Sequence, residues 1–152
     1  MIFEMETVER SHPQSPAALA LLKELNATLY DITGDDGSSS FADSHFDSQT
    51  DVFLIIRLHQ APAACGCFRR LDASTCELKR MYAKKKGLGT KILLLLEEEA
   101  IKLGYTTVVL STRKINTHAI NFYLRNGYSK IESYGKYKYT NLSICLGKLL
   151  QT

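Results

Sequence analysis

A short basic segment containing two glycines is the part of this sequence best suited to bind a charged ligand. Its residues are, in order, Lys84, Lys85, Lys86, Gly87, Leu88, Gly89 and Thr90. A strand is predicted before it, at residues 77–82, and a helix after it. Glycines let a backbone approach a phosphate closely, and the first turn of a helix offers unpaired N–H groups at the positive end of the helix dipole. We therefore predict that a ligand with several phosphates binds here.

The spacing of the glycines excludes two better-known phosphate-binding motifs. A P-loop requires Gly, four residues and then Gly-Lys-Ser/Thr, whereas Gly87 and Gly89 are one residue apart and Gly89 is followed by Thr90. A dinucleotide-binding fingerprint requires a third glycine three residues after Gly89, where this chain has Ile92. Taken alone, the two glycines could equally form a simple turn.

The segments that flank this loop are those needed to hold a site in place. From Thr90 to Leu103 apolar residues recur at steps of three and four, which is typical of an amphipathic helix, and Gly104 favours a left-handed end. Residues 106–110 are β-branched or apolar and indicate a buried strand. The predicted order is strand, glycine loop, helix, strand.

A second pattern follows the 106–110 strand. It consists of Asn116, Ala119, Phe122, Tyr123, Asn126, Gly127 and Tyr128. Together with the Glu77–Tyr82 strand and the Lys84–Gly89 loop, it resembles the GNAT superfamily of N-acetyltransferases, whose loop reads Gln/Arg-x-x-Gly-x-Gly/Ala. The resemblance covers residues 77–132 closely, and the order of elements fits the whole chain. The run Glu-Leu-Lys-Arg-Met-Tyr is similar to a bacterial, small-molecule branch of that superfamily.

This resemblance implies an N-acetyltransferase that moves an acetyl group from acetyl-CoA to a primary amine by direct attack, with no metal and no covalent enzyme intermediate. It implies one domain over residues 1–152 and an α/β fold of the α+β type. The sheet would be mixed, mostly antiparallel and twisted, with about six to seven strands and helices on both faces. The partners would be acetyl-CoA and an unidentified amine, and a homodimer is compatible with this. The alternative is a non-catalytic acyl-CoA sensor or a protein-interaction domain with the same fold.

Tyr123 corresponds to the general acid of the family, which donates a proton to the departing thiolate of coenzyme A. A free thiol has a pKa of ~8.5 and a phenol one of ~10, so this transfer is close to balanced. The alternative role for Tyr123 is an amphipathic tyrosine of the hydrophobic core.

Glu77 is the candidate general base that deprotonates the attacking amine, directly or through water. Strand alternation predicts that Glu77, Lys79 and Met81 lie on one face and the residues between them on the other. For Glu77, an ion pair with Lys79 is at least as well supported as the catalytic role.

The resemblance also implies the residues that bind the coenzyme. The strand is expected to splay from its neighbour near Met81 and Ala83, so that their backbone groups could hold the pantetheine arm and polarise the thioester carbonyl. The residues expected along the coenzyme are Met81, Tyr82, Ala83, Lys84, Lys85, Lys86, Gly87, Leu88, Gly89, Thr90, Asn116, Ala119 and Tyr123. For Asn116, a helix cap is almost equally well supported.

The chain departs from the family pattern in the loop. Its first position, usually Arg or Gln, is Lys84, which keeps the charge but loses the planar donor fork. Only four residues separate Tyr82 from Gly87, where the family usually has several more. Either the loop is unusually tight or residues are missing from the chain at this point.

The remaining elements complete the expected sheet. Further strands are predicted at residues 2–8, 52–58, 65–71, 129–133 and 142–146. A helix is predicted after Ser15-Pro16, a cap followed by proline at the first helical position. The polar, Gly/Ser/Asp-rich residues 34–48 predict a loop or a weak second helix.

Composition indicates an ordinary globular protein, with 45% hydrophobic and 23% charged residues. The net charge of +3 is too small to indicate a nucleic-acid partner. The four cysteines, at positions 65, 67, 76 and 145, have no CxxC spacing, so we expect buried, reduced thiols rather than a metal site. The acidic N-terminus is unlike a secretory signal and no apolar run approaches membrane-spanning length, so we expect a cytoplasmic protein with no membrane partner.

Overall fold

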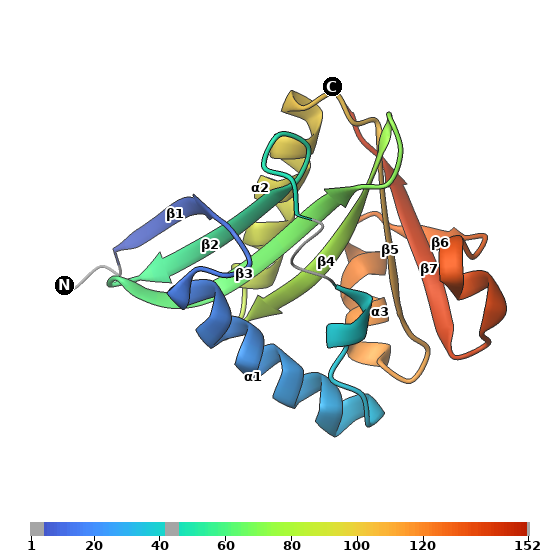
Figure 1. The fold of residues 1–152 in the computed structure, drawn as a ribbon, viewed down its shortest axis with the longest axis horizontal. Helices are drawn as coiled ribbons and strands as arrows, with labels where there is room; N and C mark the ends of the chain where they lie inside the picture. Colours follow the sequence, from blue (N-terminus) through green and yellow to red (C-terminus); the bar gives the residue numbers. More distant parts are fainter. Residues whose placement is uncertain (1–4, 42–45, 152) are drawn as a thin grey trace.

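The computed structural model describes residues 5–41 and 46–151, which form a mixed sheet with helices on both faces (Figure 1). The strands are β1 (Glu6–Ser11), β2 (Val52–Leu58), β3 (Ala61–Arg70), β4 (Thr75–Ala83), β5 (Thr107–Arg113), β6 (Ser129–Ile131) and β7 (Ser143–Leu149). The helices are α1 (Pro16–Thr33), α2 (Leu88–Lys102) and α3 (Thr117–Arg125), with short 3-10 helices η1 (Ser38–Ser40) and η3 (Gly135–Tyr139). The order across the sheet is β1-β2-β3-β4-β5-β7-β6, antiparallel except between β4 and β5. The predicted fold class is confirmed.

Two hydrophobic cores lie on opposite faces of the sheet. One packs α2 and α3 against the strands through buried side chains such as Leu93, Leu96 and Tyr123. The other packs α1 against the opposite face through Leu21 and Leu25. Burial of these apolar surfaces is the main force that holds the helices on the sheet. A ligand that enters the sheet between its strands can therefore contact residues from both sides.

The predicted helices and strands are present, with shifted ends. α1 begins after Ser15, whose Oγ accepts a hydrogen bond from Ala18 N at 3.2 Å. α2 begins at Leu88, two positions before the predicted Thr90, because Gly87 has a φ of 92° and closes the preceding turn. The first strand, predicted at residues 2–8, is observed at 6–11, and residues 1–4 lie outside the described part of the chain.

The two loops that flank the site differ in character. The 34–48 segment contains the short η1 helix and no longer helix among its described residues, with residues 42–45 outside the description. Between β4 and α2 the chain turns tightly, because Lys84 N donates to Ala63 O at 2.9 Å and Leu88 N donates to Lys85 O at 3.2 Å. The connection between β4 and α2 is therefore a tight turn.

The sheet splays where the parallel pairing of β4 with β5 would be expected to continue. β4 and β5 are paired over Thr75–Glu77 and Thr107–Val109 and no further. Beyond that point β5 stays paired with β7, and β4 stays paired with β3. Figure 1 shows the two strands close together at the top of the view and diverging downward, with α3 at the opening. The predicted splay of this strand is confirmed.

A β-bulge in β4 places the side chains that follow it on the opposite faces of the sheet from those predicted. Cys65 pairs with Tyr82 and Cys67 with Lys79, so Gly66 lies opposite both Arg80 and Met81. Arg80 has a left-handed φ of 56°. Because the bulge inserts one residue, alternation reverses after Arg80, and Met81 packs into the α2 core whereas Tyr82 packs into the α1 core. The prediction that Met81 shares a face with Glu77 and Lys79 was wrong.

Two further findings concern the cysteines and the question of membrane-spanning helices. All four cysteines are free and buried, as predicted, and burial raises the pKa of Cys65 and of Cys76 to about 12. Among the described helices, none is both long and apolar enough to cross a bilayer.

We predict that the bulge depends on Gly66. A Cβ at this position would overlap Met81 Sδ and lie 2.8 Å from Leu96 Cδ1. Gly66→Ala should therefore lower the free energy of unfolding by about 1–3 kcal/mol, measured by urea denaturation. Gly89→Ala is the control, since its nearest neighbour would lie at an ordinary 3.4 Å.

A double-mutant cycle separates this overlap from a general loss of stability. Adding Met81→Ala removes the clashing side chain, so Gly66→Ala should cost less in that background than in the wild type. Equal costs in the two backgrounds would show that Met81 does not depend on Gly66.

Candidate active site

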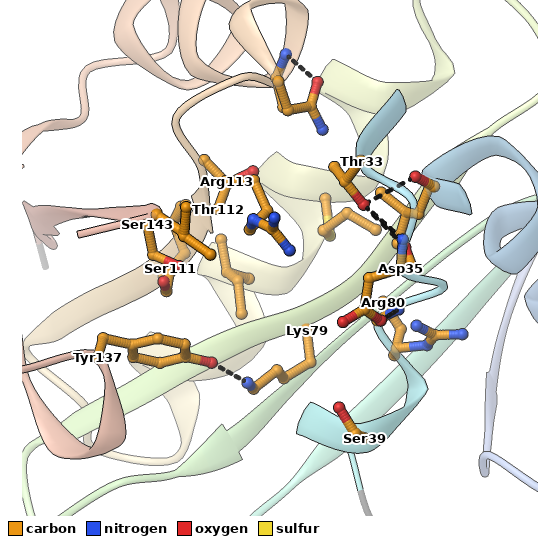
Figure 2. Close-up of a pocket in the computed structure, with 18 of the residues that line it drawn as sticks. Thr33, Asp35, Ser39, Lys79, Arg80, Ser111, Thr112, Arg113, Tyr137 and Ser143 are labelled. Atoms are coloured by element: carbon orange, nitrogen blue, oxygen red, sulfur yellow. Dashed lines mark hydrogen bonds between the residues drawn. The ribbon is translucent and has the colours of Figure 1, made fainter. Parts of the chain in front are cut away.

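The splay between β4 and β5 opens into a cavity of about 380 Å³ (Figure 2). Its walls come from residues 78–81 of β4, residues 110–113 of β5, α3, the segment from η3 to β7, and the segment from α1 to η1. The facing edges of the two strands have no ladder pairing here. Backbone N–H and C=O groups need partners, so this gap suits a ligand that carries amide groups of its own.

One end of the cavity is lined by residues predicted to bind the coenzyme. These residues are Met81, Asn116, Ala119 and Tyr123. Asn116 Oδ1 accepts a hydrogen bond from Ala119 N at 3.3 Å and caps α3, so the predicted alternative of a helix cap is observed. The same side chain also borders the cavity, so capping orients it there without excluding contact with a ligand.

Tyr123 borders the cavity from α3 and is only 8% exposed. Its ring packs edge-on against Phe122 and Tyr128, at centroid distances of 5.2 and 5.6 Å. Burial raises the pKa of its hydroxyl well above the usual value, because desolvation disfavours the phenolate. The hydroxyl thus keeps its proton across neutral and alkaline pH, which suits a proton donor better than a base.

The glycine loop lies beside this end of the cavity but does not line it. Residues 84–87 are exposed, whereas Leu88 is buried in the α2 core. Gly87 is the N-cap of α2 and provides no side chain to the free N–H groups of the first turn. A Cβ on Gly89 would lie 3.4 Å from Phe122, the neighbour of Tyr123. The helix start and the α3 end of the cavity are therefore adjacent.

The lysines around the loop are at the surface. Lys84 Nζ lies 3.1 Å from Glu24 Oε2, and Lys91 pairs with Glu6. Both pairs are substantially exposed, so each contributes little to stability and the lysines can exchange partners with an anionic ligand at small cost. The remaining predicted residues on β4, Tyr82 and Ala83, are half-buried and pack against opposite cores.

Glu77 is buried at 8% exposure and does not line the cavity. Its Oε2 accepts a hydrogen bond from the Tyr134 hydroxyl at 2.6 Å and lies 3.5 Å from Lys79 Nζ. Lys79 Nζ in turn donates to the Tyr137 hydroxyl at 3.0 Å, and Lys79 and Tyr137 both line the cavity (Figure 2). The ion pair that the sequence left open as an alternative for Glu77 is observed.

Burial perturbs this network. It lowers the pKa of Lys79, with the adjacent Glu77 carboxylate opposing the effect, and it raises the pKa of Tyr134 and Tyr137.

Of the other C-terminal tyrosines, Tyr128 donates to Glu97 in the core and Tyr139 is exposed. Among the described residues, no group of three or more His, Cys, Asp or Glu side chains is arranged to hold a metal ion.

The cavity residues that sequence reasoning missed include Arg80, Ser111 and Arg113. Arg80 forms the bulge in β4. Ser111 and Arg113 come from β5 and border the cavity opposite β4. A signal for these two existed, since Val108 and Leu110 face the α2 core and alternation places Ser111 and Arg113 on the other face.

The amino-acid sequence matches a known protein family and resembles a named protein. A family model described as "Acetyltransferase (GNAT) family" matches residues 18–128. A protein of Azospirillum brasilense named IAA acetyltransferase is 26% identical over 150 residues, which cover 95% of this chain and 97% of that protein.

Solved structures agree as well. A candidate acyl-CoA N-acyltransferase of Klebsiella pneumoniae has a TM-score of 0.82 at 28% identity, covering 97% of this chain and 99% of that one. The PaiA N-acetyltransferase of Thermoplasma acidophilum, solved with coenzyme A, has a TM-score of 0.73 at 16% identity over 95% of this chain and 99% of its own. At that identity the second likeness shows a shared fold alone.

Proposed function

We propose, from the premise that this chain belongs to the GNAT family of acetyltransferases, that it transfers an acetyl group from acetyl-CoA to a primary amine. The observation that carries the proposal is the unpaired β4–β5 gap, which has the buried Tyr123 hydroxyl on one side and the glycine-capped start of α2 beside it. We take residues 1–152 as one catalytic domain. We place it in the cytoplasm, a setting compatible with the four free cysteines.

The gap explains how the coenzyme would be held. The pantetheine arm carries amide groups, and the unpaired edge of β4 around Met81 and Ala83 offers backbone groups to them. The pyrophosphate would meet the first-turn N–H groups after Gly87, with Lys84, Lys85 and Lys86 supplying positive charge. Asn116, Ala119 and Thr90 would contact the coenzyme between these two points.

The residues around the gap also account for the chemistry. The amine nitrogen attacks the thioester carbonyl, whose oxygen is stabilised by a backbone N–H of the bulged strand near Met81. A C–N bond forms, the C–S bond breaks, and Tyr123 gives its proton to the departing sulfur. The phenol then recovers a proton from solvent. No step requires a covalent bond to the protein.

Removal of the proton from the amine is assigned to Glu77, acting through water. Glu77, Lys79 and Tyr137 form a chain that begins at a buried carboxylate and ends at the cavity. Before the bulge, Glu77 and Lys79 project from the strand face opposite Leu78, which packs into the α2 core. The proton acceptor and the proton donor Tyr123 therefore serve opposite ends of the cavity.

A binding-only role is the second candidate, and the tight turn from Ala83 to Leu88 is the observation that favours it. A shorter connection restricts how far the glycine loop and β4 can move relative to each other to fit one coenzyme molecule. Coenzyme A binding with no turnover across an amine panel would identify an acyl-CoA sensor. If the protein neither binds coenzyme A nor turns over any amine, it would instead be a protein-interaction domain.

The first functional prediction concerns the phosphate site. Coenzyme A at a hundredfold excess over its dissociation constant should stabilise the protein by ~2.7 kcal/mol. Gly89→Val should abolish this stabilisation in a thermal shift assay, because a branched side chain blocks backbone approach. Glu98→Val, an exposed change in the same helix, is the control and should keep the full effect. Unchanged coenzyme A affinity in a folded Gly89→Val protein would rule out this placement.

The second prediction concerns proton donation. Tyr123→Phe keeps the ring packing and removes only the hydroxyl, so kcat should fall roughly 100-fold while coenzyme A affinity is unchanged. Tyr105→Phe is the control, since its buried hydroxyl donates to Thr50 O outside the cavity. A fall in kcat of less than about threefold in Tyr123→Phe would return this residue to a packing role.

The third prediction concerns the base. An aliphatic amine has a pKa of ~10.4 and is mostly protonated at neutral pH. Glu77→Gln should therefore lower turnover at neutral pH and regain part of it as the pH rises and free amine becomes abundant, with coenzyme A binding intact. Glu97→Gln is the matched control, because Glu97 is also buried and also accepts from a tyrosine beside a lysine. A defect of equal size at every pH would assign Glu77 to packing instead.

A further inference from the structure

The end of the cavity that faces α1 and η3 is strongly basic. Among the described residues that line the cavity, the basic side chains are Lys79, Arg80, Arg113 and Lys136, and Asp35 is the only acidic residue. Lys79 is already paired with Glu77, and Arg80 contacts Asn26. Arg113 stands apart from these, because no ion pair accounts for its charge among the described residues.

Arg113 carries a buried donor that lacks an acceptor. Its Nε is shielded from solvent and has no hydrogen-bond partner among the described residues, and the same is true of Ser111 Oγ on the same strand. A buried polar group without a partner costs free energy, so such groups are rare unless a ligand or water completes them. Two of them border one cavity, where a single bound ligand could complete both.

The position of Arg113 separates it from the coenzyme end. Val108 and Leu110 face the α2 core, so Ser111 and Arg113 project toward the opposite face of β5. Figure 2 draws the Arg113 guanidinium between Thr112 and Ser143 on one side and the Thr33–Asp35 region on the other. Tyr123 and Asn116 approach the same cavity from α3. A group bound by Arg113 would therefore belong to the acceptor rather than to the coenzyme arm.

We propose that the acceptor is an amine that also carries a carboxylate, and that Arg113 and Ser111 bind this carboxylate. The guanidinium fork matches a carboxylate with two parallel hydrogen bonds, and the Ser111 hydroxyl adds a third donor. Lys136 adds positive potential, which disfavours an acceptor whose only charges are positive. The inference rests on the proposed function, since it names the substrate class for that site.

Matched pairs of acceptors test this inference. The panel consists of α-amino acids and unbranched ω-amino acids of about two to six carbons, each beside its primary amide, which keeps the amine and removes the negative charge. The best carboxylate should exceed its amide in kcat/KM by about tenfold or more, as expected for a charge-assisted hydrogen bond. Arg113→Gln should erase that preference mainly through KM, and Arg113→Lys should retain part of it. Arg125→Gln, an exposed change on α3, is the control.

Direct measurement of acceptor binding tests the inference even if no turnover is detected. Calorimetry on the coenzyme A-loaded protein should detect saturable binding of the preferred amino carboxylate in the wild type and not in Arg113→Gln, with coenzyme A affinity equal in both. Equal use of carboxylates and amides, preference for a phosphorylated amine, or no binding of any amino carboxylate would overturn the inference and leave the proposed function standing. Weakened coenzyme A binding in Arg113→Gln would also overturn it, by assigning Arg113 to the coenzyme. Failure of the proposed function itself would appear instead as absent coenzyme A binding in the wild type.

Discussion

The site depends on the loss of pairing between two parallel strands in the middle of the sheet. β4 and β5 are hydrogen-bonded only up to Glu77 and Val109, and each remains held by its other neighbour. A central strand normally has both edges satisfied, so an open edge inside the protein leaves polar backbone groups that need another partner. An amide-bearing ligand such as the coenzyme A arm supplies such partners. The cavity, the glycine loop and Tyr123 are all arranged around this opening.

The bulge at Arg80 determines which β4 side chains lie on each face of the sheet at the site. It reverses the alternation of β4, so that Glu77 and Lys79 serve one face whereas Met81 packs on the other. Gly66 makes room for Met81 from the neighbouring strand. In the proposed function, the amine and the base Glu77 would lie on the α1 side while the leaving sulfur meets Tyr123 from α3. The inserted residue would then place the acceptor and the coenzyme on opposite faces.

Much of the fold could be predicted from local patterns. The helix start at Ser15-Pro16, the helix after the glycine loop and the strands all follow from short-range signals that act within one element. The bulge could not, because the break in alternation at Arg80 and Met81 does not by itself specify an inserted residue, and the packing of Met81 over Gly66 involves another strand. The partners of Glu77 could be only half predicted, since Lys79 is two residues away whereas Tyr134 is distant in sequence. The cavity joins residues from five segments, and its basic side chains come from β4, β5 and η3, so no sequence motif contains them together.

The proposed function requires that the opening between β4 and β5 receive the coenzyme arm. A crystal structure of this protein with acetyl-CoA would show where the arm lies. We expect the arm in the opening, its amides paired with the β4 edge near Met81 and Ala83, and its sulfur within about 3.5 Å of the Tyr123 hydroxyl. An ordered coenzyme whose arm lies outside the opening, with the sulfur remote from Tyr123, would rule out this mode of binding.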